Sequence, residues 1–274
     1  MLRRFAPFLL LMTVVLAACG AGALSDPKEI ITQGLDKTGA VKSFHVSVTV
    51  TGNVTEPSSG TSIALDGTTL EGDVATSGSA SLTFAVPTML GLKGDVLVVD
   101  KKDLYVKSTL TGAKWSHQAM PIPSPAASGA SASPGADVAA MVAKLKEFLA
   151  KDGVVTKKLD DVTCGDRKCY HLQVTIPSSV MADSMASASP KPSLNPADIF
   201  GDALVLDLQF DQESLWLTSL STSIDSAKVG TINLTVTLSA FNEAVTVTPP
   251  PADQVQEGGL TLPSGLPIPV LPGS

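Results

Sequence analysis

The chain has 274 residues with 26 acidic and 19 basic side chains, a formal net charge of −7 at pH 7. This acidic balance argues against nucleic acid as a partner, because phosphate backbones are bound by clustered basic residues. It also argues against electrostatic adhesion to anionic lipid. Aromatic residues make up only 4% of the chain, which disfavours a surface that stacks on bases or sugars.

The first 19 residues have the pattern of an export signal. Arg3 and Arg4 precede an apolar stretch over residues 5–15, and small residues follow it. This stretch is shorter than the roughly 20 residues of a membrane-spanning helix. Residues 16–19, Leu-Ala-Ala-Cys, resemble the lipobox of bacterial lipoproteins, in which the cysteine thiol receives a diacylglycerol and the peptide is cut before it. The alternative is an ordinary signal peptide cleaved after Ala18, which would leave a free thiol on Cys19.

By this resemblance, residues 1–18 are a lipoprotein signal peptide and Cys19 is the lipidated first residue of the mature protein. Residues 19–25 are then a flexible tether. Two or more acyl chains hold a protein stably on a bilayer, whereas one chain binds only marginally. We therefore expect a domain anchored by its lipid to the outer, extracytoplasmic face of the cell membrane. No later segment of the sequence has the apolar length of a membrane span.

The first half of the domain reads as one helix followed by strands. The helix begins with Asp26 as its N-cap and ends at Gly39. Residues 44–51 alternate apolar and polar side chains with a period of two, which predicts a half-buried strand. Further strands are predicted at residues 62–70, 79–86, 95–99 and 104–107.

The second half contains a helix, more strands and two low-complexity loops. The loops cover residues 121–136 and the region near 183–196. Asp137 caps a helix over residues 137–150, whose apolar positions recur every three or four residues. Residues 249–274 are rich in Pro and Gly and are expected to be a disordered tail, so a single domain covers residues 26–248. The strands predicted in this half are 154–162, 169–176, 204–210, 215–224, 231–239 and 244–247.

These elements predict an α+β fold built on one long antiparallel sheet. A sheet of this many strands must curl or split. Its apolar concave face then needs a cover, which two amphipathic helices can supply. We therefore expect a long curved sheet, or half-barrel, with helices packed over its concave face.

Three short segments resemble the mycobacterial LppX/LprAFG lipoproteins. They are residues 41–45 (VKSFH) leading into the first strand, the LY and KW pairs within residues 104–115, and residues 245–250 (VTVTPP). The order of elements agrees over roughly residues 26–250. Those proteins have the LolA-like fold, a half-barrel with helices over its mouth that encloses a hydrophobic cavity. The resemblance implies carriage of a lipid or a lipidated glycan across the cell envelope. The cysteine pair, the two loops and the tail depart from the family pattern.

The remaining two cysteines predict a disulfide. Cys164 and Cys169 flank four turn-prone residues between two alternating strands, so the two side chains can meet across a hairpin. Export places the pair in an oxidising compartment. The alternatives are a redox site or a metal site with His171 as a third ligand, but zinc needs three or four protein ligands. We expect the disulfide and no metal.

Catalysis finds no support in the sequence. It contains no Gly-x-Ser-x-Gly elbow, no His-Glu-x-x-His motif and no phosphate-binding loop. Asp160 and Asp161 are paired carboxylates at a strand end, where a solvated turn is the simpler reading. His45 is expected to be exposed, and His117 is expected in a surface loop beside Trp115. We expect neither an enzyme nor a cofactor other than the diacylglycerol on Cys19.

The leading hypothesis is a monomeric lipid carrier. A hydrophobic cavity between sheet and helices would shield acyl chains during transfer, and a membrane transporter or acceptor protein would be its partner. The alternative is an envelope sensor or scaffold that binds a protein partner and no lipid. A third reading is that the same apolar side chains fill a core. The predicted cavity residues are Phe44, Val46, Val48, Leu82, Phe84, Leu234 and Val236.

Overall fold

The structure is a computed structural model that describes residues 24–56, 60–110, 112–120, 138–186 and 195–257. The predicted signal peptide, Cys19 and most of the tether lie outside these residues. The same holds for the loop at 121–136, for residues 187–194 of the second loop and for residues 258–274 of the tail.

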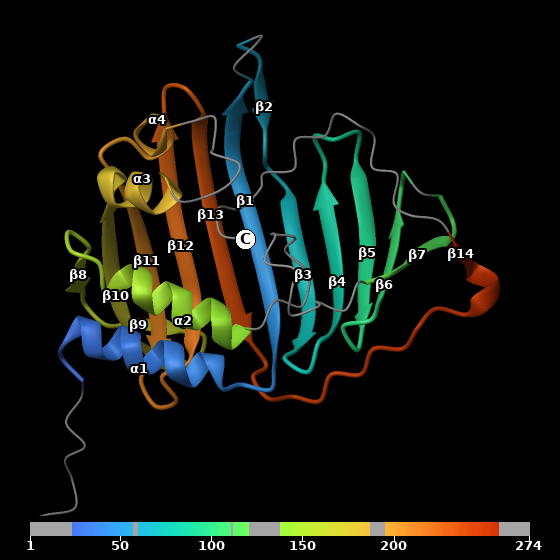
Figure 1. The fold of residues 1–274 in the computed structure, drawn as a ribbon, viewed down its shortest axis with the longest axis horizontal. Helices are drawn as coiled ribbons and strands as arrows, with labels where there is room; N and C mark the ends of the chain where they lie inside the picture. The colour runs from blue at the N-terminus through green and yellow to red at the C-terminus, as the bar shows by residue number, and fades with distance from the viewer. Residues whose placement is uncertain (1–23, 57–59, 111, 121–137, 187–194, 258–274) are drawn as a thin grey trace, which may run out of the picture.

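One open sheet of 14 strands runs through the described residues (Figure 1). Its strand order is β14-β7-β6-β5-β4-β3-β1-β13-β12-β11-β10-β8, with β2 paired to β1 and β9 paired to β10. The pairing of β14 with β7 is parallel, and the other pairs are antiparallel. The strands are β1 (Ser43–Thr55), β2 (Ser62–Ala64), β3 (Thr68–Ala75), β4 (Ser79–Val86), β5 (Leu92–Val99), β6 (Asp103–Ser108), β7 (Trp115–Ala119), β8 (Val155–Lys158), β9 (Val162–Cys164), β10 (Arg167–Pro177), β11 (Ala203–Asp211), β12 (Leu217–Ser226), β13 (Gly230–Ser239) and β14 (Val255–Glu257).

The helices gather over one half of this sheet. Figure 1 shows α1, α2, α3 and α4 on the side of β8 and β10–β13, whereas no described helix lies over β3–β7. Asp26 caps α1 as predicted, since its carboxylate accepts hydrogen bonds from the backbone N–H groups of Lys28 and Glu29. None of the described helices combines the length and hydrophobicity needed to span a bilayer. The helices are α1 (Pro27–Gly39), α2 (Val138–Leu149), α3 (Ser178–Ala186), α4 (Pro196–Phe200) and the 3-10 turn η1 (Ala252–Gln254).

The buried core lies where these helices meet the sheet. Ile30 and Leu35 on α1 pack into one cluster with Leu172 on β10 and Phe210 on β11. Ile30, Leu172 and Phe210 have no solvent exposure at all. The largest buried cluster thus lies in the covered half of the sheet, where an apolar helix face meets the apolar sheet face. Val98 on β5 and Val106 on β6 are also buried, although no described helix lies over them.

The predicted fold class is confirmed: the molecule is a long, unclosed, mainly antiparallel sheet with helices over one face. The strand predicted at 62–70 is interrupted, because Gly67 at a φ of 79° turns the chain between β2 and β3. The strand predicted at 154–162 is likewise divided into β8 and β9.

Three other expectations are corrected. Residues 244–247 form no strand. The region expected to be a loop near 183–196 is bordered by α3 and α4, and α3 extends into it. Residues 252–257 of the expected disordered tail form η1 and β14, because the free edge of β7 offers hydrogen-bonding groups that β14 pairs with in parallel.

A glycine sets the distance between α1 and the sheet. A Cβ atom on Gly34 would collide with the ring of Phe210 and would lie 3.1 Å from the carbonyl oxygen of Leu215. The helix therefore packs closer to β11 than any residue with a side chain would allow.

We expect Gly34→Ala to lower the free energy of unfolding by about 1–3 kcal/mol through overpacking, although alanine is the better helix former by about 1 kcal/mol. Thr32→Ala on the exposed side of α1 is the matched control and should be neutral or stabilising. Urea unfolding of both variants is the measurement. A Gly34→Ala protein as stable as the Thr32→Ala protein would contradict the packing argument.

Candidate functional site

Strand register gathers the apolar side chains on one face of the sheet. Val48 on β1 lies opposite Val236 on β13 and Leu70 on β3, and Leu70 lies opposite Phe84 on β4. Residues directly opposite each other on neighbouring strands point to the same face. The same row continues on the other side of β13 through Leu220, Leu208 and Leu172.

Helix cover divides this face into two parts. Under the helices, Leu172 and Leu208 are 0% and 4% exposed. Beyond the helices, Val236 and Val48 are only half-buried, although the register places them in the same row. We call this second part the half-buried apolar face. The half-buried side chains that define it are Phe44, Val46, Val48, Val50, Leu70, Val74, Leu82, Phe84, Val96, Leu234, Val236 and Leu238. The register also places Val98 and Val106 on this face, where both are buried.

All seven side chains predicted to line a cavity belong to the half-buried apolar face. Leu82 joins it because it lies opposite Gly72, which lies opposite Val46. None of the seven is a member of the buried core cluster. The structure therefore brings together on one surface residues that the sequence separates widely, and they remain the predicted lining of a ligand site.

A hollow of about 440 Å³ adjoins this face at the ends of β4, β5 and β6. Phe84 of the half-buried apolar face lines it together with Lys93, Asp95 and Lys107, which alternate with that face in the strand register. A Cβ atom on Gly94 would collide with the Phe84 ring, so the glycine lets this ring lie against the backbone of β5. The volume falls within the range of about 300–1,000 Å³ that is typical of small-molecule sites.

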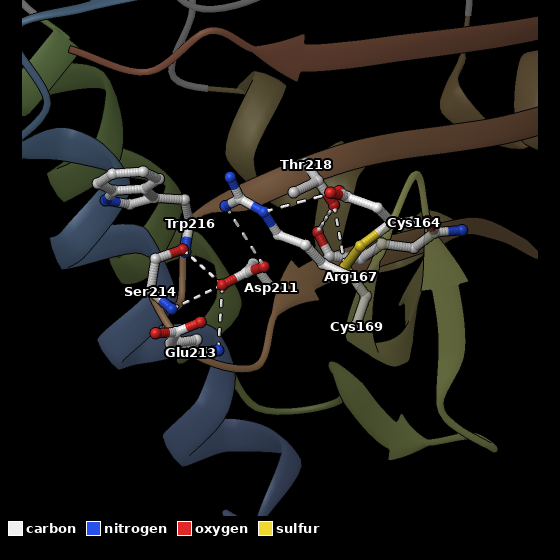
Figure 2. Close-up of a disulfide and its surroundings, with 10 residues drawn as sticks. Cys164, Arg167, Cys169, Asp211, Glu213, Ser214, Trp216 and Thr218 are labelled. Atoms are coloured by element: carbon white, nitrogen blue, oxygen red, sulfur yellow. Dashed lines mark hydrogen bonds and ion pairs between the residues drawn. A yellow bond between two sulfur atoms is a disulfide. The ribbon is translucent and has the colours of Figure 1, made fainter.

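A separate group of polar residues surrounds the predicted disulfide, which the structure contains (Figure 2). The Cα atoms of Cys164 and Cys169 are 6.0 Å apart, which suits a disulfide. The turn that it closes presents Arg167, whose Nη1 is 3.7 Å from the buried Oδ2 of Asp211. Because the cysteines are bonded to each other, neither is available as a metal ligand or nucleophile.

Asp211 organises the turn between β11 and β12. Its Oδ1 accepts hydrogen bonds from the backbone N–H groups of Glu213 and Ser214, at 3.0 and 2.6 Å, and from the Ser214 hydroxyl. Burial acts to raise the pKa of the Asp211 carboxyl, but these hydrogen bonds and the charge of Arg167 outweigh it, so the pKa lies below its ordinary value. The ionised carboxylate therefore holds the turn between β11 and β12 in its conformation through these hydrogen bonds.

A cleft of about 570 Å³ opens beside this turn. Trp216 and Phe241 form an aromatic pair in its wall, with ring centroids 4.8 Å apart. Gln209, Ser219 and Thr237, which alternate with the apolar row, also line it. These polar residues place the cleft mainly on the polar face of the sheet, and Leu238 of the half-buried apolar face also lines it.

Each histidine pairs with an aspartate of a neighbouring strand. His45 Nδ1 lies 2.8 Å from Asp73 Oδ1, and its Nε2 lies 3.4 Å from Glu71 Oε1. The hydrogen bond with Asp73 is the largest cause of a raised pKa for His45. Sequence reasoning treated His45 as an isolated exposed residue, because its partner stands 28 positions away and is identified only by the register of β1 and β3.

The other two histidines follow the same pattern. His117 Nε2 lies 2.8 Å from Asp103 Oδ1, and His171 Nε2 lies 3.4 Å from Asp207 Oδ1. His117 was expected in a loop but lies on β7, where it pairs with Tyr105 of β6 in the ladder. Within the described residues, no group of three or more His, Cys, Asp and Glu side chains is placed to hold a metal ion.

The arrangement of strands and helices is similar to that of solved mycobacterial lipoproteins. LprF from Mycobacterium bovis matches with a TM-score of 0.52 and 18% sequence identity, over 82% of this chain and 96% of that one. LppX from Mycobacterium tuberculosis matches with a TM-score of 0.47 and 19% identity, over 82% of this chain and 100% of that one. No protein-family model and no curated protein sequence matches the chain.

The fold defines the class of this protein as a long, open, mainly antiparallel sheet with helices over one face, an arrangement that matches the LolA-like half-barrel fold. More narrowly, the likeness to LprF shows that the chain has the LppX/LprF-type lipoprotein fold. The resemblance predicted from the sequence is thereby confirmed at the level of the fold, which is all that a likeness at 18% identity describes.

We expect Asp211→Ala to lower the free energy of unfolding by about 1–3 kcal/mol, because it leaves the partly buried backbone N–H groups of Glu213 and Ser214 without their acceptor. Asp166→Ala is the matched control: this carboxylate is also near Arg167 but is 98% exposed, and its loss should cost less than about 0.5 kcal/mol. The contribution of Asp211 should be present above the ordinary carboxyl pKa of 3.8 and disappear as the pH falls through its lower folded value. Urea unfolding at several pH values tests both statements, and equal effects of the two variants would contradict them.

The raised pKa of His45 predicts that its pairing stabilises the fold at low pH. The contribution should be fully present below the ordinary histidine pKa of 6.5 and be lost as the pH rises through the higher folded value. His45→Gln should therefore reduce stability at about pH 5 by up to about 1 kcal/mol and leave stability at about pH 9 unchanged. Unfolding curves at both pH values provide the measurement. A deficit that is the same at both would rule out a charge interaction.

Proposed function

We propose that this protein is a membrane-anchored bacterial lipoprotein that binds a lipid on the half-buried apolar face of its sheet, next to the helices, and carries it across the cell envelope. The observation that carries the proposal is the half-buried apolar face, which continues the core row of Leu172 and Leu208 beyond the described helices. A soluble domain gains little from leaving a contiguous apolar surface of this extent partly exposed, and such surfaces are typical of ligand or partner sites.

The mechanism is passive binding and release. Acyl chains would lie along the rows of Val, Leu and Phe side chains, and each methylene removed from water would contribute about 0.8 kcal/mol. A single long chain therefore supplies useful affinity without any specific polar contact. The cargo is transferred unchanged, so the proposal includes no catalytic step. Contact with an acceptor protein or membrane would permit release.

The anchor belongs to the same proposal. A diacylglycerol on Cys19 would hold the domain at the extracytoplasmic face of the membrane, since two acyl chains bind a bilayer stably. The described chain begins beside the core, where the backbone N–H of Leu24 donates a hydrogen bond to the Tyr170 hydroxyl. The first described residue, Leu24, thus lies beside β10, in the half of the sheet that carries the helices.

Native and denaturing mass spectrometry of the mature chain, begun at residue 19 with Cys19→Ser, tests the proposal. We expect extra mass in the native spectrum that is lost on denaturation and can be extracted as lipid. Val48→Asp should abolish this adduct, because it places a carboxylate in the half-buried apolar face at a cost of several kcal/mol against bound acyl chains. Thr49→Asp, one residue along on the exposed face of β1, is the matched control and should retain the adduct.

Val48→Thr provides a second variant of nearly equal volume, for use if the aspartate prevents folding. A clean unliganded mass for the parent protein after expression in a lipid-rich host would contradict lipid carriage. The same outcome would favour the envelope sensor or scaffold, whose ligand is a protein. Loss of the adduct in Thr49→Asp as well as Val48→Asp would show that the lipid does not bind on this face.

A further inference from the structure

Two neighbouring hairpin turns expose leucine side chains at one end of the sheet. Leu90, in the turn between β4 and β5, is 96% exposed, and Leu110, just after β6, is 54% exposed. The turns are adjacent because β5 pairs with β6: the backbone N–H of Thr109 donates to the carbonyl oxygen of Lys93 at 2.9 Å. Two large apolar side chains thus project into solvent from neighbouring turns.

The conformation of Leu90 argues against a role in folding. Its φ is 55°, in the left-handed region that disfavours residues with a Cβ and that glycine or asparagine adopts more readily. The turn itself is held by backbone hydrogen bonds from Met89 to Val86 and from Gly91 to Pro87. The leucine side chain contributes almost no burial to the fold, so the stability of the turn gives no reason for an apolar residue here.

The residues around these leucines have the chemistry of a membrane interface. Lys93 and Lys107 lie on β5 and β6 directly behind the turns, and the Lys107 ammonium group is 6.0 Å from the ring centroid of Trp115 on β7. Lys114 is exposed next to Trp115, while Asp95 is the acidic residue opposite Lys107 in the ladder. Tryptophan and lysine behind exposed leucines match the order of groups from headgroup region to acyl chains.

We propose that this corner, which we call the hairpin tip (Leu90, Leu110, Lys93, Lys107 and Trp115), docks on the surface of a bilayer that contains anionic lipid. The leucines would enter the acyl boundary, and the lysines would contact lipid phosphates. The net charge of −7 argues against adhesion of the protein as a whole. The hairpin tip differs from the acidic protein as a whole, because it combines two lysines with two exposed leucines.

The location of the tip connects docking with the proposed cargo site. β1, β4 and β6 run in the same direction, because β3 and β5, which lie between them, are antiparallel to their neighbours. The C-terminal ends of β1, β4 and β6 therefore lie at the same end of the sheet. The hollow lined by Phe84, Lys93 and Lys107 lies at this end too. A docked tip would therefore bring the bilayer next to the half-buried apolar face. This connection rests on the proposed function, whereas docking itself does not.

Vesicle binding of the mature chain with Cys19→Ser tests the docking proposal without the lipid anchor. The chain has two tryptophans, so a Trp216→Phe background leaves Trp115 as the only reporter. We expect its emission to shift to shorter wavelength with vesicles of phosphatidylcholine and phosphatidylglycerol, more weakly with phosphatidylcholine alone, and less as salt is raised. Leu90→Asp and Leu110→Asp should each weaken vesicle co-sedimentation by about tenfold or more, and Lys93→Gln by about fivefold.

Val155→Asp is the matched control, since Val155 on β8 is 60% exposed but lies at the opposite edge of the sheet; it should bind vesicles like the parent. Equal binding by the Leu90→Asp and parent proteins would overturn the proposal. Chemical cross-linking provides a second test. If Leu90→Asp lost a cross-link to another protein but still bound vesicles, the hairpin tip would be a protein interface and the proposal would be overturned.

The lipid adduct in the native mass spectrum is scored separately on the same samples. An adduct without vesicle binding would overturn docking and leave lipid carriage standing. Vesicle binding by the hairpin tip without any lipid adduct would support docking and contradict the proposed lipid carriage.

Discussion

A period-two alternation of apolar and polar side chains, carried in register through a row of paired strands, governs this structure. Once Val48 on β1 is paired with Val236 and Leu70, the faces of the neighbouring strands are determined, because a slip of one residue would turn every side chain over. The result is one apolar face much larger than the helices that lie on it. Both the stable core and the proposed ligand surface are parts of that single face.

Helix cover determines which part becomes core. Close approach of α1 at Gly34 allows Phe210 to be fully buried, and the same cluster includes Leu172 and Leu208. The β3–β7 half has no described helix above it, and most of its valines and leucines are half-buried, with Val98 and Val106 as buried exceptions. The largest buried cluster and the proposed ligand surface therefore lie in different halves of one sheet.

Local patterns in the sequence predicted much of this fold, including α1, α2, most strands, the disulfide hairpin and the shared face of the seven predicted cavity residues. Helix cover was not predictable, because Leu208 and Val236 have the same alternating context and yet differ in burial. Residues 255–257 lack a strand pattern and pair only because β7 has a free edge. The partners of the histidines were missed for a related reason, since each pair depends on the register between strands.

The pairing of β1 with β13 in the middle of the sheet has a consequence for how the chain folds. It joins the start and the end of the domain: the backbone N–H of Lys42 donates to the Asn242 side chain, 200 positions away. Contacts of such high sequence separation form slowly, because a long loop must be closed before they provide any stabilisation. The pairing of β1 with β13 cannot form until β13, the last long strand, has been synthesised. For the export that we propose, this means that the sheet is completed only after nearly all of the chain has crossed the membrane.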